Sequence, residues 1–228
     1  MKIKNPFSDL TKFELALWLT SVISITVSFL MSGNKDWLTV TSSLIGVTAL
    51  IFIAKGYVIG QILLIVFSVF YGTVSFFFSY YGEMITYLGM SAPAAVAAVV
   101  SWMKHPYKDT KEVEISRLTK KQLIIGILST VAVTAVFYFI LGALNNASLA
   151  VSTLSVTTSF IASYLTYYRS PYYAIGYAAN DLVLIVLWII ATIESISYLP
   201  MVICFIMFFA NDIYGFVSWK RMQKRQSE

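Results

Sequence analysis

The sequence predicts an all-α integral membrane protein whose eight helices cross the bilayer. Of its 228 residues, 58% are hydrophobic and 12% are charged, whereas a soluble domain usually carries about 25% charged residues. The apolar residues fall into runs of about 20, the length with which a helix spans the hydrocarbon core. These runs lack the strict apolar–polar alternation of porin strands, which excludes a transmembrane β-barrel.

Eight apolar segments are separated by charged residues and turn formers. In chain order the segments are 14–31, 37–54, 57–80, 83–103, 122–144, 147–168, 171–193 and 197–218. The connections that end the first seven are Ser32–Asp36, Lys55–Gly56, Tyr80–Glu83, Lys104–Lys121, Asn145–Asn146, Arg169–Pro171 and Glu194–Ser195. Each connection holds a residue type that interrupts an apolar helix. Since eight is even, we expect both termini on the same side.

The basic residues predict the orientation. With the N-terminus in the cytoplasm, fifteen of the sixteen Lys and Arg residues fall on the cytoplasmic side, and only Lys35 falls outside. The fifteen are Lys2, Lys4, Lys12, Lys55, Lys104, Lys108, Lys111, Arg117, Lys120, Lys121, Arg169, Lys220, Arg221, Lys224 and Arg225. This bias follows the positive-inside rule, so both termini are expected in the cytoplasm. The net charge of +5 is then explained by topology and contact with anionic headgroups, and nucleic acid is not an expected partner.

An internal repeat predicts how the helices are organised. Val40–Ile45 matches Val156–Ile161 and Tyr57–Gly60 matches Tyr173–Gly176 at an offset of 116, while Ser101–Trp102 matches Ser218–Trp219 at 117. Ordered matches at one spacing indicate a duplication. The predicted units are an N-terminal segment with the first helix (1–35), repeat 1 (36–104), a cytoplasmic loop with a linker helix (105–146), repeat 2 (147–219) and a basic cytoplasmic tail (220–228). This is an N-terminal helix followed by a 3+1+3 arrangement of parallel repeats, between which transporters place their substrate.

Two polar pairs at similar depth mark a candidate site in the second repeat. Asn180-Asp181 and Asn211-Asp212 lie about seven to nine residues from the cytoplasmic ends of adjacent helices, or roughly 10–15 Å deep at 1.5 Å per residue. A carboxylate at that depth is costly, so each is expected to face the bundle interior or a water-filled cavity. The alternative is that these residues only form hydrogen bonds between helices.

Aromatic residues accompany these polar pairs. Trp188 follows Asp181 by seven positions and Tyr214 follows Asn211 by three, so each is expected near the face of its polar partner. Rings beside acids and amides suit a flat ligand with a polar rim, including a cation.

Other residues receive weaker predictions. Gln61, Tyr71 and the Tyr80–Glu83 corner are candidates for contacts from the first repeat, and Pro93 is a candidate hinge. Hydroxyl-rich stretches at 39–43 and 155–159 are assigned to close helix packing. Three tryptophans near segment ends, Trp37, Trp102 and Trp219, are expected in an interfacial aromatic belt.

Four stretches resemble the PnuC family of bacterial vitamin transporters, which have a SWEET-like fold. They are Tyr81–Met90, Trp102–Pro106, Asn180–Trp188 and Asn211–Trp219. The resemblance implies uptake of nicotinamide riboside across the bacterial inner membrane by facilitated diffusion, without ATP or an ion gradient. It also implies that a cytosolic kinase traps the substrate by phosphorylation.

The chain departs from the family at the start of the ligand helix, where Gly176 stands in place of a bulky stacking ring. Many members have a W-x-x-W-x-x-x-N/Q pattern there, to which Tyr173, Gly176 and Asn180 correspond; Tyr173 is therefore a candidate contact. Relatives in this family carry thiamine, riboflavin or deoxynucleosides, which remain alternative substrates.

The residues also bear on other function classes. With one histidine, His105, and no H-E-x-x-H motif, an intramembrane zinc protease is excluded. The single Cys204 excludes a disulfide framework. A protease using Asp181 and Asp212 as an acid pair, a proton-coupled transporter, and a binding subunit of a larger machine remain open. We expect no enzymatic activity, cofactor or metal; a homo-oligomer also stays open.

Overall fold

The computed structural model describes residues 5–33, 37–77, 81–146 and 148–228. Its elements, in order, are η1 (Pro6–Asp9), α1 (Lys12–Met31), α2 (Trp37–Ala54), α3 (Val58–Phe77), α4 (Tyr81–Thr86), η2 (Tyr87–Ser91), α5 (Ala92–Met103), α6 (Lys120–Ala143), α7 (Leu149–Tyr167), α8 (Tyr173–Glu194), η3 (Ile196–Tyr198) and α9 (Leu199–Ser227). Eight spans in these described ranges are long and apolar enough to cross a membrane, which confirms the predicted number. The predicted boundaries at Tyr80 and Ala147, and the position of Lys35, lie outside the described residues.

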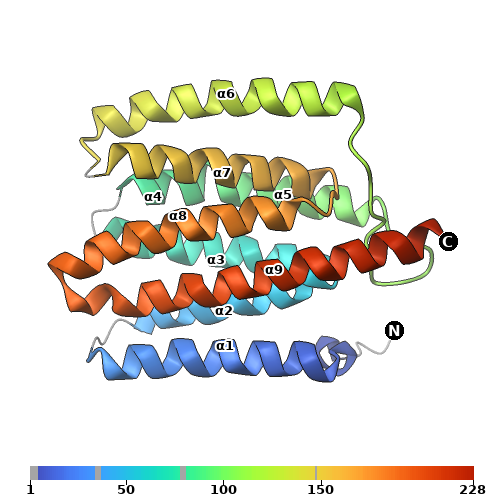
Figure 1. The fold of residues 1–228 in the computed structure, drawn as a ribbon, viewed down its shortest axis with the longest axis horizontal. Coiled ribbons are helices and arrows are strands. Elements are labelled where there is room, and N and C mark those ends of the chain that lie inside the picture. Colours follow the sequence, from blue (N-terminus) through green and yellow to red (C-terminus); the bar gives the residue numbers. More distant parts are fainter. Residues whose placement is uncertain (1–4, 34–36, 78–80, 147) are drawn as a thin grey trace.

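The helices lie side by side in one elongated bundle (Figure 1). α1 and α6 occupy opposite edges, and α2 and α9 lie between α1 and the rest. α5 contacts both α3 and α7, so the third and sixth spans meet through it. The start of α1, the end of α9 and the connection between α5 and α6 are at the same end of the bundle (Figure 1), which we call the termini end.

Two helices begin slightly before their predicted starts because polar side chains cap them. Thr11 accepts the backbone N–H of Glu14, and Glu14 accepts that of Thr11, at the start of α1. Thr119 and Gln122 make the same reciprocal pair at the start of α6. Such a capping box satisfies N–H groups of the first turn that have no partner within the helix. Each cap therefore precedes the first apolar run.

The fourth span is not a regular α-helix. α4 passes into the π-helical η2, and α5 follows with Pro93 in its first turn. A π-helical turn changes the direction in which side chains point and is frequent at functional sites. Tyr87 and Ser91 of η2 both face the central cavity. The hinge at Pro93 stays a prediction.

Two of the tryptophans assigned to an interfacial belt are not there. Trp102 is 1% exposed and Trp219 is 0% exposed, so that prediction is wrong for both, while Trp37 is 65% exposed. The buried indoles satisfy their N–H groups internally. Trp102 donates to the Thr166 carbonyl at 3.0 Å, and Trp219 donates to the Ile53 carbonyl at 2.8 Å.

The predicted tail from residue 220 continues α9 to Ser227. Met222 keeps the helix against the bundle by packing beside Val113 and Trp219. Near its end, Gln226 bonds the backbone of Val113 and Ile115. The last turns of α9 are therefore part of the folded body.

Candidate functional site

Two carboxyl groups meet in the interior. Asp181 of α8 and Asp212 of α9 are 4% and 3% exposed, and their side chains lie within hydrogen-bonding reach of one another. Neither forms an ion pair within the described part of the chain. The two acids predicted at equal depth are thus brought into contact.

The acid pair borders a central cavity of about 40 Å³. The cavity is bounded by six elements, α2, α3, η2, α7, α8 and α9. Its walls are Gly46, Leu50, Ile53, Leu64, Phe67, Ser68, Tyr87, Ser91, Ser159, Tyr177, Asp181, Phe205, Phe208 and Asp212. None of these side chains is basic, so the only full charges that this wall can carry are negative.

Helical spacing explains how the acids come to face inward. Tyr177 and Asp181 are four residues apart on α8, and Phe208 and Asp212 are four apart on α9; residues at this spacing share a helix face. Burial of these apolar faces carries the acids into the interior with them. The carboxylates are therefore held on rigid helices and not on loops.

Several buried polar groups around the cavity have no hydrogen-bond partner among the described residues. Both amide atoms of Gln61, the Ser68 hydroxyl and one oxygen of Asp181 are in this class. Gln61, Leu64 and Ser68 share a face of α3, and of these Leu64 and Ser68 reach the cavity. A buried polar group without a partner costs about 1–3 kcal/mol. Such groups beside a cavity indicate a place that receives a polar guest.

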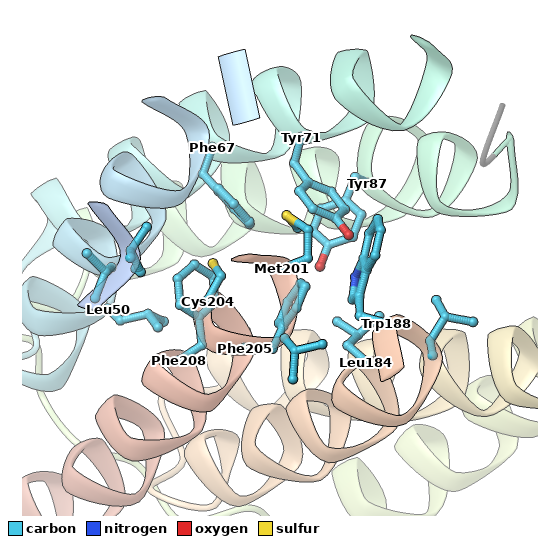
Figure 2. Close-up of a cluster of buried hydrophobic side chains, with 14 of the residues drawn as sticks. Leu50, Phe67, Tyr71, Tyr87, Leu184, Trp188, Met201, Cys204, Phe205 and Phe208 are labelled. Atoms are coloured by element: carbon cyan, nitrogen blue, oxygen red, sulfur yellow. The ribbon is translucent and has the colours of Figure 1, made fainter. Parts of the chain in front are cut away.

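Aromatic rings from α3, η2 and α8 lie next to Phe205 of the cavity wall (Figure 2). The rings of Tyr71 and Tyr87 are 4.4 Å apart between centroids, and Trp188 packs in the same cluster of buried side chains. Figure 2 shows these three side chains beside one another above Phe205 and Leu184. Glu83, 4% exposed with one oxygen unpartnered in the described chain, is within electrostatic reach of both tyrosines.

The two asparagines turn away from this cavity. Asn180 accepts hydrogen bonds from Ser155 and Thr158 of α7, both at 3.0 Å. Asn211 donates to Ser21 of α1 at 3.0 Å. The structure therefore brings together the acids but not the amides predicted with them, and the alternative of hydrogen bonds between helices describes the amides well.

Two predicted aromatic contacts also lie apart from the cavity. Tyr214 donates to Glu14 at 2.8 Å and faces α1. Tyr173 packs on Trp219, with ring centroids 4.6 Å apart, near the termini end. At Gly176 a Cβ would come within 2.9 Å of the Ala162 backbone, so this position faces α7 closely and has no room for a stacking ring.

Of the fourteen residues that line the cavity, sequence reasoning named only Asp181 and Asp212 as site residues. Among those it missed are the polar or aromatic Ser68, Tyr87 and Tyr177. The spacing of Tyr177 from Asp181 was a usable signal, as was that of Ser68 from Gln61, since positions four or seven apart share a face. Tyr87 follows Glu83 by four positions, but the π-helical turn that begins at Tyr87 is not readable from apolar periodicity.

No group of three or more metal-ligating side chains occurs within the described ranges.

Comparisons with known proteins give a consistent result. The model of the nicotinamide mononucleotide transporter family matches residues 36–221. The nicotinamide riboside transporter PnuC of Neisseria mucosa is 27% identical over 227 residues, which cover 97% of this chain and 86% of that protein.

Among solved structures, the crystal structure of the vitamin B3 transporter PnuC matches with a TM-score of 0.81 and 26% identity, covering 95% of this chain and 94% of that one. The family match extends over the spans that build the cavity. The eight-helix membrane fold, the buried acid pair and these matches lead to one conclusion: this chain belongs to the nicotinamide mononucleotide transporter family of membrane transporters, to which the PnuC proteins belong.

Proposed function

We propose that this protein takes up nicotinamide riboside across the bacterial inner membrane by facilitated diffusion. The observation that carries the proposal is the cavity at the Asp181–Asp212 pair, enclosed by six elements and lined by aromatic and polar side chains. The names of the PnuC relatives supply the substrate. The nicotinamide ring of this nucleoside is a flat cation, which suits a site with acids and aromatic faces.

The site that we propose consists of Asp181 and Asp212 with Gln61, Tyr71 and Trp188. The acids would meet the positive ring, Gln61 would pair with the ribose or amide, and the two aromatic residues would stack. Tyr87, Tyr177 and Ser68 join this set because they line the cavity. At about 40 Å³ the cavity must widen to hold a nucleoside, so side chains or helices move when substrate binds.

Retention in the cell follows from charge. A phosphate added by a cytosolic kinase brings roughly two negative charges at neutral pH, and the cavity wall has acids but no basic side chain among the residues described. Repulsion would keep the phosphorylated product out of the pathway. The transporter itself would then use neither ATP nor an ion gradient, and the ATP would be consumed by the kinase.

Alternating access would come from two three-helix halves, α2–α5 and α7–α9, with α6 as the linker. Trp102 in the first half donates to Thr166 in the second, and Trp219 in the second donates to Ile53 in the first. This reciprocal pairing supports a two-fold relation between the halves. Parallel repeats of this kind rock about a midplane site.

Further support for the repeat comes from Gly60 and Gly176, which the sequence alignment matched. A Cβ on Gly60 would come within 2.5 Å of the Ile53 backbone, and one on Gly176 within 2.9 Å of the Ala162 backbone. In each half, therefore, the second helix approaches the first at its glycine. The termini end would be cytoplasmic, since most of the basic residues are expected there.

The test is flux into proteoliposomes that contain the purified protein and no energy source. Saturable uptake of labelled nicotinamide riboside that stops at equal concentrations is expected. The reduced, uncharged riboside has nearly the same size, and we expect it to compete several-fold less well. Absence of saturable flux with the riboside, while thiamine, riboflavin or a deoxynucleoside is carried, would identify one of the alternative substrates.

Proton coupling is a second candidate, because two facing carboxyl groups can bind and release a proton. An imposed pH gradient distinguishes proton coupling from facilitated diffusion. With the membrane potential held at zero, facilitated diffusion of the cationic riboside gives no accumulation above the outside concentration under a pH gradient. Proton coupling gives accumulation, which a protonophore abolishes.

A further inference from the structure

A groove on the lipid-facing side of the bundle lies outside the proposed transport site. It runs between α6 and α7, has a volume of about 290 Å³, and is lined by apolar side chains such as Leu123, Ile127 and Ile161. The α6 wall has little cover, since Leu123 and Ile127 are exposed. In a bilayer this groove opens to acyl chains.

The groove continues into a basic pocket at the termini end. This second pocket, of about 580 Å³, is lined by Arg117, Tyr172 and Lys220 among others. Leu123 and Leu165 belong to both walls. One concavity therefore passes from a charged mouth to an apolar interior.

Within the described part of the chain, the cations at the mouth have no acidic partner. Lys220 lies 4.7 Å above the Tyr172 ring and bonds Gln223 at 3.3 Å. Neither Lys220 nor Arg117 is in an ion pair in these ranges, where Lys55, Lys111 and Arg225 each are. No acidic side chain is among the described residues that line the pocket. Its charge is therefore free to act on an anion.

Length indicates which kind of anion fits. From Leu123 to Val131 the α6 wall extends eight residues, or about 12 Å at 1.5 Å per residue. This is less than half of a hydrocarbon core about 30 Å thick. The groove thus stays within one leaflet and starts at the level where headgroups lie.

We propose that this concavity binds one anionic phospholipid of the leaflet at the termini end. The phosphate lies between Arg117 and Lys220, and an acyl chain lies along α6 and α7. Basic pockets between transmembrane helices on the cytoplasmic side are suited to anionic headgroups. A zwitterionic lipid fits less well, because its own cation would face two unpaired cations.

The expected preference is measurable. Each basic side chain near a membrane surface favours an anionic lipid by roughly five-fold, so two give a preference of roughly 25-fold for phosphatidylglycerol over phosphatidylcholine. The full-length protein in detergent micelles is mixed with both lipids, carrying identical acyl chains, and native mass spectrometry counts the bound lipids of each kind.

Three variants separate the groove from general surface charge. Arg117→Gln with Lys220→Gln is expected to remove most of the preference. Ile127→Trp fills the apolar part and is expected to reduce binding of both lipids. Lys104→Gln with Lys108→Gln removes two exposed cations elsewhere on the same end and is expected to leave the preference unchanged.

Competition by a water-soluble phosphate ester distinguishes a lipid site from a site for free phosphate. Glycerol phosphate lacks acyl chains and is expected to leave bound phosphatidylglycerol in place. The proposal is overturned by equal binding of the two lipids to the native chain, by an equal loss in both charge variants, or by displacement with glycerol phosphate.

Discussion

In each Asn-Asp pair on α8 and α9, the two side chains face different neighbours, because consecutive side chains point about 100° apart around a helix. Asp181 faces the cavity while Asn180 faces α7. Asp212 faces the cavity while Asn211 faces α1. The sequence showed two Asn-Asp pairs at one depth, but helical depth alone does not say which member of each pair points inward.

Removing one carboxylate charge should weaken substrate binding. We expect Asp181→Asn and Asp212→Asn each to raise the Kd for nicotinamide riboside roughly ten-fold or more, since a hydrogen bond to a charged group contributes about 1.5–3 kcal/mol. Asn keeps the shape of Asp, so the cavity should persist. The measurement is isothermal titration or ligand-dependent thermal shift on purified protein.

Control variants separate charge at the cavity from other effects. Asp109→Asn makes the same change at an exposed position and should leave the Kd unchanged. Asn180→Ala removes an acceptor of two hydrogen bonds, so it should lower the melting temperature while the folded protein still binds. Native affinity in both cavity variants would argue against the acids as ligand contacts.

At the scale of elements, the connection between α5 and α6 contacts several separate parts of the fold. We call residues 104–119 the strap. Val113 donates to the Gly56 carbonyl at 2.9 Å and Ser116 donates to the Arg169 carbonyl at 3.0 Å. Gly56 and Arg169 both have positive φ, 69° and 56°, at the turns that follow α2 and α7. The strap therefore bonds equivalent turns in the two proposed halves.

Charged contacts reinforce the middle of the strap. Glu112 pairs with Arg225 of α9, and Lys111 pairs with Asp9 at 2.6 Å. The Lys111 hydrogen bond lowers the pKa of Asp9. Because the pKa of Asp9 is lowered on folding, the pair stabilises the fold at every pH above the ordinary Asp pKa, near 3.9. This stabilisation is lost only as the pH falls through the lowered pKa of Asp9 in the folded protein. The Lys111–Asp9 contact is thus intact at neutral pH.

Opening of the termini end should expose the strap. Val113 is 1% exposed and packs with Trp102, Trp219 and Met222. In Val113→Cys, made in a Cys204→Ser background, we expect slow labelling by a membrane-impermeant thiol reagent. Saturating substrate should speed the labelling several-fold if the strap moves during each transport cycle.

Lys108→Cys supplies the matched control, because this strap position is already exposed and should react quickly under all conditions. Equal labelling of the Val113→Cys variant with and without substrate, in protein shown to transport, would mean that the strap stays closed and that release follows another route.

At the scale of the whole molecule, charge and periodicity were enough to predict the eight spans, because hydrophobic length and turn residues act locally. The repeat, predicted from matches such as Tyr57–Gly60 with Tyr173–Gly176, stays a prediction. The site was only partly predictable. Asp181 and Asp212 were found from depth, while Tyr87 depends on a π-helical turn and the burial of Trp102 and Trp219 depends on carbonyls in distant helices.

The two buried tryptophans test the two-fold relation between the halves. Each indole N–H bonds a carbonyl that also accepts the N–H of a positive-φ residue: Thr166 accepts from Trp102 and Arg169, and Ile53 accepts from Trp219 and Gly56. If the halves are equivalent, Trp102→Phe and Trp219→Phe should destabilise the protein equally, by about 1 kcal/mol of lost hydrogen bonding each, plus the cost of the smaller ring.

The indoles also touch, with centroids 5.3 Å apart, so the double variant should differ from the sum of the single ones by about 0.5 kcal/mol or more, as contacting residues do. Thermal unfolding in detergent measures all three. Trp18→Phe is the control, because it breaks an indole hydrogen bond of 3.1 Å to Thr48, between α1 and α2. This bond does not join the two halves. The loss of stability in Trp18→Phe should therefore add to that of either other substitution without coupling. A large loss of stability from only one of the two substitutions would contradict a symmetric pair. In a two-fold arrangement, the hydrogen bonds of Trp102 and Trp219 contribute equally to the free energy of unfolding.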